Sequence, residues 1–179
     1  MSLIQRIRRF AAAEKGLAAL EFAIIAPMMI LLVFGSVDLI DTLGANKRAQ
    51  NAAASIADVV ARDDNVTNAE ITGLWAALDV LMYPDNGAAM TMRVSSVSIV
   101  DATTARVVWS EGHGMTARVA NTTVSLPSQM MTPGTSVIMT ESSFPYEAPL
   151  GFLHTGSVNL EHNAYRRSRL VDPIPRQYS

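Results

Sequence analysis

The stretch Gly16-Leu17-Ala18-Ala19-Leu20-Glu21-Phe22 opens an apolar run that continues without a break to Val37. The run from Leu17 to Val37 has 21 residues with Glu21 as its only charge, close to the roughly 20 that cross a hydrocarbon core as a helix. A secretory signal has a shorter apolar core, of about 7 to 15 residues, and ends at a small-residue cleavage site. The sequence therefore predicts a membrane-spanning helix with one acid inside it.

The charges on either side of this run are unequal. The N-terminal side carries the basic residues Arg6, Arg8, Arg9 and Lys15, and the C-terminal side carries the acids Asp38 and Asp41. Positively charged flanks stay in the cytoplasm. We therefore expect an inner-membrane protein with a cytoplasmic N-terminus and a periplasmic C-terminal domain.

The overall charge and the lack of cysteine limit the classes of function. The formal net charge of the whole chain is −2, and without residues 1–16 ten basic residues face fifteen acidic ones, a net charge of −5. An acidic domain is a poor match for a nucleic-acid backbone, which needs a basic face. The chain contains no cysteine, so we expect no disulfide and no thiolate site.

Two residues inside the apolar run have special chemistry. An ionisable side chain within a membrane is costly, so Glu21 marks a candidate functional site. The alternative is that Glu21 lies near the end of the span and its carboxylate reaches water. Pro27 lacks a backbone N–H and follows Glu21 by one and a half turns, so we expect it to kink or loosen the helix.

The sequence around the glycine resembles a known family. Gly16 followed by Leu17 to Phe22, with Glu21 at the fifth position after the glycine, resembles the processing site of type IV pilin-like proteins. Within that group, the string from Gly16 to Pro27, Val37-Asp38 and Gln50-Asn51-Ala52-Ala53 resembles the TadE-like pseudopilins of tight-adherence (Flp-type) pili, over Gly16 to about Arg62. The basic leader, the glycine, the glutamate and the proline all fall at the family spacing.

The resemblance implies roles for individual residues. It implies that a prepilin peptidase cuts after Gly16 and leaves Leu17 as the new N-terminus. The carboxylate of Glu21 would then pair with the Leu17 ammonium of a neighbouring subunit, which offsets the cost of both charges in lipid. Glu21 and Phe22 would thus serve assembly.

The function implied is that of a minor pilin, or pseudopilin, which assembles or primes a tight-adherence type IV pilus and reaches the cell surface with it. The expected partners are the membrane, the prepilin peptidase, other pilins and pseudopilins, and the pilus assembly platform. The resemblance implies no enzyme activity, and we expect no cofactor, nucleic acid or small-molecule substrate. The alternative from another class is a single-pass periplasmic adaptor, sensor or hydrolase module with an uncleaved membrane anchor.

Beyond the membrane segment we expect the same helix to continue to about Arg62. Small apolar residues recur at alternating steps of four and three and form a narrow stripe, namely Ala45, Ala49, Ala52, Ile56 and Val59. The stripe can pack against the sheet of its own domain, or part of it can face other pilins.

The remaining chain predicts one short helix and several strands. Thr67 and Glu70 form a capping-box pattern, before an apolar face of Ile71, Leu74, Trp75, Leu78 and Leu81 or Met82. From Met90 the period changes to two, which predicts a hairpin of residues 90–99 and 107–109 with its turn at 101–104. Further strands are predicted at 119–126, 136–142 and 157–165.

The C-terminal part also resembles the TadE-like pattern, as a strand from Ser136, an aromatic-proline segment, a final strand and then arginine. We expect Pro145 and Pro149 to confine their segment to an edge or a loop. The large apolar residues there form either an exposed contact patch or a small satellite cluster, and they are Phe144, Tyr146, Phe152 and Leu153. Pro173 and Pro175 predict a loose tail.

Other candidate sites find little support in the sequence. His113, His154 and His162 are scattered and lack paired carboxylates at ligand spacing, so we expect no metal site. The basic cluster of Arg166, Arg167 and Arg169 either meets an acidic neighbour or balances local acids.

These patterns predict an α+β fold that is pilin-like, with a long N-terminal helix packed on a small C-terminal antiparallel sheet. The expected organisation is a cleaved basic leader at 1–16, a transmembrane helix at 17–40, an amphipathic continuation at 41–62 and a periplasmic or extracellular α+β domain at 63–179.

Overall fold

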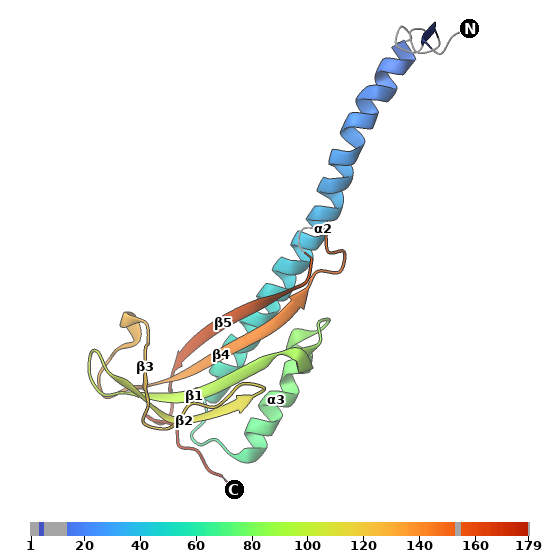
Figure 1. The fold of residues 1–179 in the computed structure, drawn as a ribbon. Coiled ribbons are helices and arrows are strands. Elements are labelled where there is room, and N and C mark those ends of the chain that lie inside the picture. Colours follow the sequence, from blue (N-terminus) through green and yellow to red (C-terminus); the bar gives the residue numbers. More distant parts are fainter. Residues whose placement is uncertain (1–3, 6–13, 153–154, 179) are drawn as a thin grey trace. The chain divides into compact units, whose positions relative to one another are not determined.

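The computed structural model describes residues 4–5, 14–152 and 155–178 (Figure 1). Its contacts divide the chain into a first unit, Met1–Asp41 with Ala148–Gly156, and a second unit, Thr42–Glu147 with Ser157–Ser179. The elements in chain order are α2 (Glu14–Val60), α3 (Asn68–Met82), η1 (Gly87–Ala89), β1 (Thr91–Ile99), β2 (Ala105–His113), β3 (Thr123–Val124), η2 (Ser128–Met130), β4 (Ser136–Glu147) and β5 (Ser157–Arg167).

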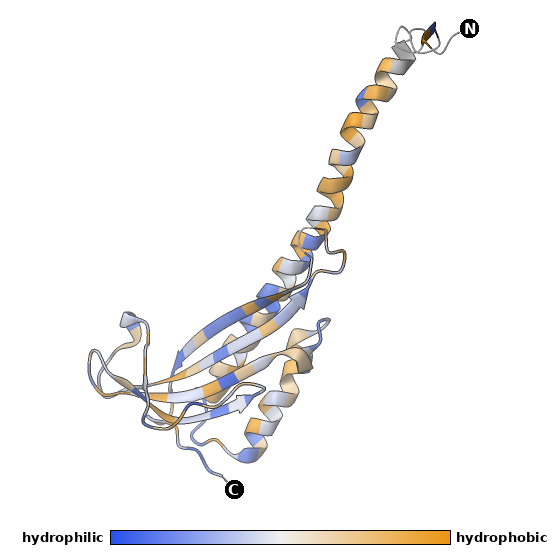
Figure 2. Cartoon of the chain, viewed as in Figure 1, coloured by the Kyte–Doolittle hydropathy of each residue, from blue (hydrophilic) through white to orange (hydrophobic). Residues whose placement is uncertain are grey.

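The predicted long helix is confirmed as α2, which is continuous through Pro27. It is long and apolar enough to cross a membrane, and none of its most apolar 18-residue window is buried in the structure. Figure 2 shows hydrophobic residues along this N-terminal part. Helix α2 continues on both sides of Pro27, so Pro27 does not end the helix. The expected kink or loosening at Pro27 stays a prediction.

In the second unit, the buried face of α2 is made mostly of alanine. The fully or nearly fully buried residues are Ala45, Ala49, Ala52, Ala53, Ile56, Ala57 and Val60. The predicted stripe is therefore correct as far as Ile56 and wrong at Val59, which is exposed. An ideal α-helix turns every 3.6 residues, so the buried face drifts from the 3.5-residue stripe toward Val60.

Helix α3 begins at the predicted capping box. The Glu70 backbone N–H donates to Thr67 Oγ1 at 3.3 Å, and the Thr67 backbone N–H donates to Glu70 Oε2 at 2.6 Å. The two bonds satisfy N–H groups that have no partner within the helix. The buried face is Ile71, Leu74, Leu78 and Met82, as predicted, and Trp75 is half-buried.

The sheet is antiparallel, with strand order β3-β2-β1-β4-β5. The predicted hairpin is confirmed as β1 and β2, with an irregularity in register between Ser96 and Val97. The strand predicted at 119–126 is much shorter, because only Thr123 and Val124 pair with β2. The long helix and the sheet together confirm the predicted α+β class.

Strand β4 continues through Pro145 and pairs there with Asn159 of β5. Its pairing with β1 reaches only as far as Ser143. Beyond Ser143, β4 has β5 as its one paired neighbour, so a residue without an N–H is tolerated. The expectation that the segment of Pro145 and Pro149 lies at an edge or in a loop is therefore confirmed, since Pro145 lies in the part of β4 beyond β1 and Pro149 lies in the loop that follows.

Two aromatic residues of β4 belong to the interior. Phe144 and Tyr146 are buried, so the idea that they form an exposed patch is wrong for both. Strand β4 is also tied to α2, because Thr140 Oγ1 donates a hydrogen bond of 3.0 Å to the Ala53 carbonyl oxygen. Of the other two residues of the expected patch, Phe152 is exposed and Leu153 lies outside the described residues.

The expectation of a loose C-terminal tail is also wrong. Ile174 is fully buried, and its carbonyl accepts a 2.8 Å hydrogen bond from Trp109 Nε1. Arg176 forms a bridge with Val66 and an ion pair of 2.9 Å with Glu111. The flanking Pro173 and Pro175 restrict the backbone on either side of Ile174, which supplies the apolar anchor.

Candidate functional site

The sequence predicts a site on the N-terminal part of α2, which belongs to the first unit. Leu17, Glu21 and Phe22 are all exposed there. Leu17 and Glu21 are four residues apart and thus lie on one face of the helix, one turn from each other. Neighbouring exposed residues are apolar, so Glu21 is an isolated charge on a surface suited to lipid or to another helix.

The peptide bond between Gly16 and Leu17 lies within α2 (Glu14–Val60). Glycine lowers helix stability by about 1 kcal/mol relative to alanine. The predicted processing bond therefore follows a residue that weakens the helix locally.

Where the apolar run ends, Asp38 holds a loop that is distant in the sequence. Asp38 is 0 % exposed. Its Oδ1 accepts a hydrogen bond of 3.2 Å from the Leu150 backbone N–H, and its Oδ2 accepts one of 2.5 Å from the Phe152 backbone N–H. Both donors lie in the loop Ala148–Gly156 of the same unit. We call this arrangement the Asp38 anchor.

An aromatic contact supports the Asp38 anchor. The rings of Phe34 and Phe152 have centroids 6.0 Å apart with an interplanar angle of 40°, a separation typical of favourable aromatic pairs. Phe34 lies one turn before Asp38 on α2, so the loop contacts two successive turns of the helix. Hydrogen bonds and an apolar contact thus fix the same segment.

Sequence reasoning missed this anchor. It used Asp38 as an acid that orients the helix and as part of the family pattern, and the loop donors lie 112 and 114 residues away. The available signal was a lone acid directly after an apolar run, combined with the uncharged connector Pro149-Leu150-Gly151-Phe152. Neither pattern states that the two segments meet.

In the second unit, the arginines of the predicted basic cluster meet a local acid. Asp58 Oδ1 lies 2.6 Å from Arg169 Nη2 and 3.9 Å from Arg166 Nε, and Asp58 also pairs with Arg62 in the turn that follows α2. Of the two alternatives for this cluster, the structure favours local balance for Arg166 and Arg169. Arg167 instead contacts the turn around Thr132, where its Nη2 donates to Thr132 Oγ1 at 2.8 Å.

A second ionic group joins the sheet to the segment after β2. Glu141 of β4 lies opposite Arg93 of β1 and pairs with it at 2.7 Å, and Arg118 pairs with the other carboxylate oxygen at 2.7 Å. Burial raises the pKa of Glu141, but the hydrogen bonds from Arg118 and Arg93 lower it by more, so the pKa lies below its usual value of 4.5. The two ion pairs of Glu141 connect β1, β4 and the segment after β2, and each of the three charged side chains has a partner.

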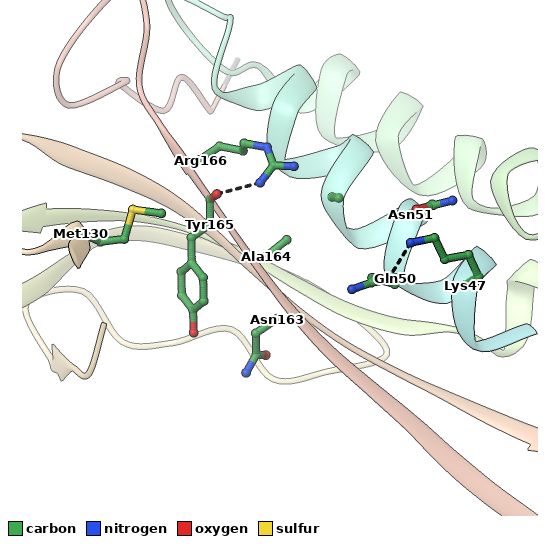
Figure 3. A pocket seen from close by; sticks show the side chains of 9 residues that line it. Lys47, Gln50, Asn51, Met130, Asn163, Ala164, Tyr165 and Arg166 are labelled. Carbon is green, nitrogen blue, oxygen red and sulfur yellow. Dashed lines mark hydrogen bonds between the residues drawn. The ribbon is translucent and has the colours of Figure 1, made fainter. Parts of the chain in front are cut away.

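A groove of about 360 Å³ lies between α2 and β5 (Figure 3). Its side chains are mostly polar and come from Lys47, Gln50, Asn51, Ala54, Met130, Asn163, Ala164, Tyr165 and Arg166. Lys47 Nζ donates to Gln50 Oε1 within α2, and Arg166 Nη1 donates to the Tyr165 carbonyl oxygen. Lys47 and Arg166 thus donate to neighbours on their own helix or strand, and they do not converge on a common ligand position in the groove.

The histidines do not form a site in the part of the chain that the structure describes. The ring of His113 stacks on Trp75 at 5.4 Å, and His162 Nε2 lies 3.0 Å from Asn46 Oδ1. Among the described residues there is no group of three or more His, Asp or Glu that could hold a metal ion. The third histidine, His154, lies outside the described residues.

The comparison with family models finds one match. Residues 16–58 match the model described as TadE-like protein. The match begins at Gly16, includes Leu17, Glu21, Phe22 and Pro27, and covers most of α2, so the predicted resemblance is confirmed over this range. Neither the curated proteins nor the solved structures gave a match.

Proposed function

Starting from the TadE-like segment at residues 16–58, we propose that this protein is a minor pilin of a tight-adherence pilus that a prepilin peptidase processes after Gly16. The observation that carries the proposal is the position of Glu21. It is an exposed carboxylate and the only charge in the stretch from Leu17 to Val37, one turn after the residue that would become the N-terminus. The helix is the part of the chain that would enter the membrane and later the filament.

The chemistry of Glu21 explains why processing and assembly would be coupled. Before cleavage the Leu17 nitrogen is an amide and carries no charge. After cleavage it is an ammonium, and the Glu21 carboxylate of a neighbouring subunit can pair with it. In lipid, both charges gain from this pairing because each alone is costly. Cleavage would therefore create the partner that Glu21 needs.

The geometry supports pairing between subunits. Successive residues rise about 1.5 Å along the helix, so Leu17 and Glu21 of one chain are about 6 Å apart. A shift of one neighbouring subunit along the helix axis by about this distance would bring its ammonium level with the carboxylate. The exposed apolar residues around Glu21 would then pack between helices as the ion pair forms.

The orientation in this proposal comes from the basic leader, which would keep the N-terminus in the cytoplasm. The second unit, with its sheet and α3, would then lie in the periplasm before assembly and on the cell surface afterwards. Other pilins and pseudopilins and the assembly platform would be the partners.

N-terminal sequencing and intact-mass measurement of the protein from its native membrane test the proposal. We expect a chain that begins at Leu17 in peptidase-positive cells and at Met1 in cells without the peptidase. Sheared surface filaments should contain the shorter form. A chain that retains residues 1–16 in peptidase-positive cells and is absent from filaments would instead support the permanently anchored adaptor or sensor.

A further inference from the structure

The loop held by Asp38 has the properties of a second membrane contact. Its stretch Ala148-Pro149-Leu150-Gly151-Phe152 carries no charge. Leu150 and Phe152 are each 48 % exposed, although both are large and apolar. Two such side chains on a short loop form an apolar surface next to the helix that would cross the membrane.

The depth of this loop follows from its contacts with α2. The Phe152 ring contacts Phe34, which lies inside the apolar run of Leu17 to Val37. Phe34 lies about 6 Å from Asp38 along the helix axis, toward the middle of the run. Phe152 is therefore level with the last turn of the membrane-spanning stretch, and the loop lies at the boundary between hydrocarbon and head groups.

A loop can lie at this depth only if its backbone N–H groups find acceptors, because the acyl region supplies none. The Asp38 anchor supplies them for Leu150 and Phe152. Gly151 lies between the two donors with φ of +60°, in the left-handed region that glycine adopts freely. A left-handed residue is one of the features of backbone turns whose N–H groups converge on one anion.

We propose that the loop is a lipid-binding element, in which Leu150 and Phe152 enter the outer interface of the bilayer beside α2 while Asp38 holds the loop at that depth. The lipid bilayer is the favoured occupant because the apolar surface is continuous with the membrane-spanning stretch through the contact between Phe34 and Phe152. The inference rests on the membrane placement in the proposed function. It adds a contact that would fix how deeply α2 sits before the subunit is taken into a filament.

Depth-dependent fluorescence quenching tests this inference. The chain has no cysteine, so one introduced cysteine gives one labelling site. A Leu150→Cys variant of the full chain, labelled with an environment-sensitive dye, would be placed in phosphatidylcholine vesicles at low protein density. We expect nitroxide lipids labelled near the head group to quench the dye strongly, and nitroxide carried deep in the acyl chain to quench it less.

Two reference positions separate failure of the inference from failure of the membrane placement. Leu32→Cys, on the exposed apolar part of α2, should be quenched most by the deep nitroxide, and Val119→Cys, an exposed apolar position in the second unit, should not be quenched. Quenching at 32 but not at 150 would overturn the loop inference alone. No quenching at 32 would overturn the membrane placement and the inference with it.

Substitution of the Asp38 anchor tests the mechanism. In the Leu150→Cys background, Asp38→Ala should lower quenching several-fold, toward the level at Val119, whereas Asp38→Asn, which retains a carbonyl acceptor, should lower it less. The matched control is Asp41→Ala, because Asp41 is exposed and lies one turn away at the same end of the span. Unchanged quenching at position 32 would show that α2 is still inserted. Equal quenching at 150 in all three variants would overturn the role of Asp38.

Discussion

Trp109 Nε1 donates a hydrogen bond of 2.8 Å to the carbonyl oxygen of Ile174, which joins the middle of β2 to the C-terminal segment. Both residues are buried. The bond satisfies a carbonyl group in a segment that forms no regular strand, and a buried polar group without a partner is costly. The hydrogen bond from the Val66 N–H to the Pro175 carbonyl and the ion pair of Arg176 with Glu111 hold the same segment.

Trp109→Phe removes the donor and keeps an aromatic ring. We expect the free energy of unfolding to fall by about 1 to 3 kcal/mol, because the Ile174 carbonyl is left buried without this donor. Chemical denaturation measures the change, and limited proteolysis should cut the tail faster. Trp75→Phe is the control, since Trp75 is half-buried and should matter less. An equal loss in both variants would contradict the special role of the bond to Ile174.

The alanine face of α2 allows the helix and the sheet to approach closely. Ala53 is fully buried and its carbonyl accepts the bond from Thr140. Ala53→Leu should overpack this contact and destabilise the protein by about 1 to 3 kcal/mol. The control is Ala54→Leu, at a half-buried position on the rim of the groove. Thermal unfolding should show a lower midpoint for the first variant than for the second.

The paired Glu141 makes stability depend on pH. Its pKa in the folded protein lies below the usual 4.5, so the folded state favours the ionised carboxylate more than the unfolded state does. This contribution is present above pH 4.5 and is lost as pH falls through the lowered pKa. We expect Glu141→Gln to be less stable than the parent at neutral pH, with the difference shrinking in acid.

Denaturation curves between neutral pH and about pH 3 check this effect of pH on stability. Glu161→Gln is a suitable control, because Glu161 is exposed on the neighbouring strand β5. The interpretation fails if the difference in stability between parent and Glu141→Gln stays constant across this range.

The features that the sequence predicts well are those in which the deciding residues are close together along the chain. The capping box needs only Thr67 and Glu70, and the apolar run from Leu17 needs only composition and length. The family pattern around Gly16 and Glu21 is equally local, and the family match includes it. Short-range patterns of this kind reflect backbone chemistry that tertiary contacts rarely reverse.

The features that were missed depend on contacts between distant segments. Asp38 meets the loop more than 100 residues later, and Trp109 meets Ile174 at a separation of 65. The prediction for Val59 was wrong for a different reason, since a stripe of five residues between positions 45 and 59 does not distinguish a 3.5-residue from a 3.6-residue period. Composition alone predicted that proline would loosen the tail, whereas the burial of Ile174 and the contacts of Trp109 and Arg176 hold it on the domain.

The proposed role of Glu21 predicts that processing and assembly can be separated. Glu21→Ala leaves Gly16 and Leu17 unchanged, so we expect normal removal of residues 1–16. It removes the carboxylate that would pair with the Leu17 ammonium of a neighbour, so we expect a large loss from sheared filaments with normal amounts in the membrane. N-terminal sequencing and immunoblots of the two fractions measure both effects.

Two further variants make this test specific to the charge on Glu21. Glu21→Asp retains a carboxylate and should keep part of the incorporation, whereas Glu21→Gln has nearly the same shape without the charge and should behave like Glu21→Ala. Gly16→Val should block processing and therefore also incorporation, although Glu21 is intact, because the Leu17 ammonium does not form. Ala13→Val is its control within the leader. Normal incorporation of Glu21→Gln would show that shape, rather than pairing of charges, is what the filament requires at this position.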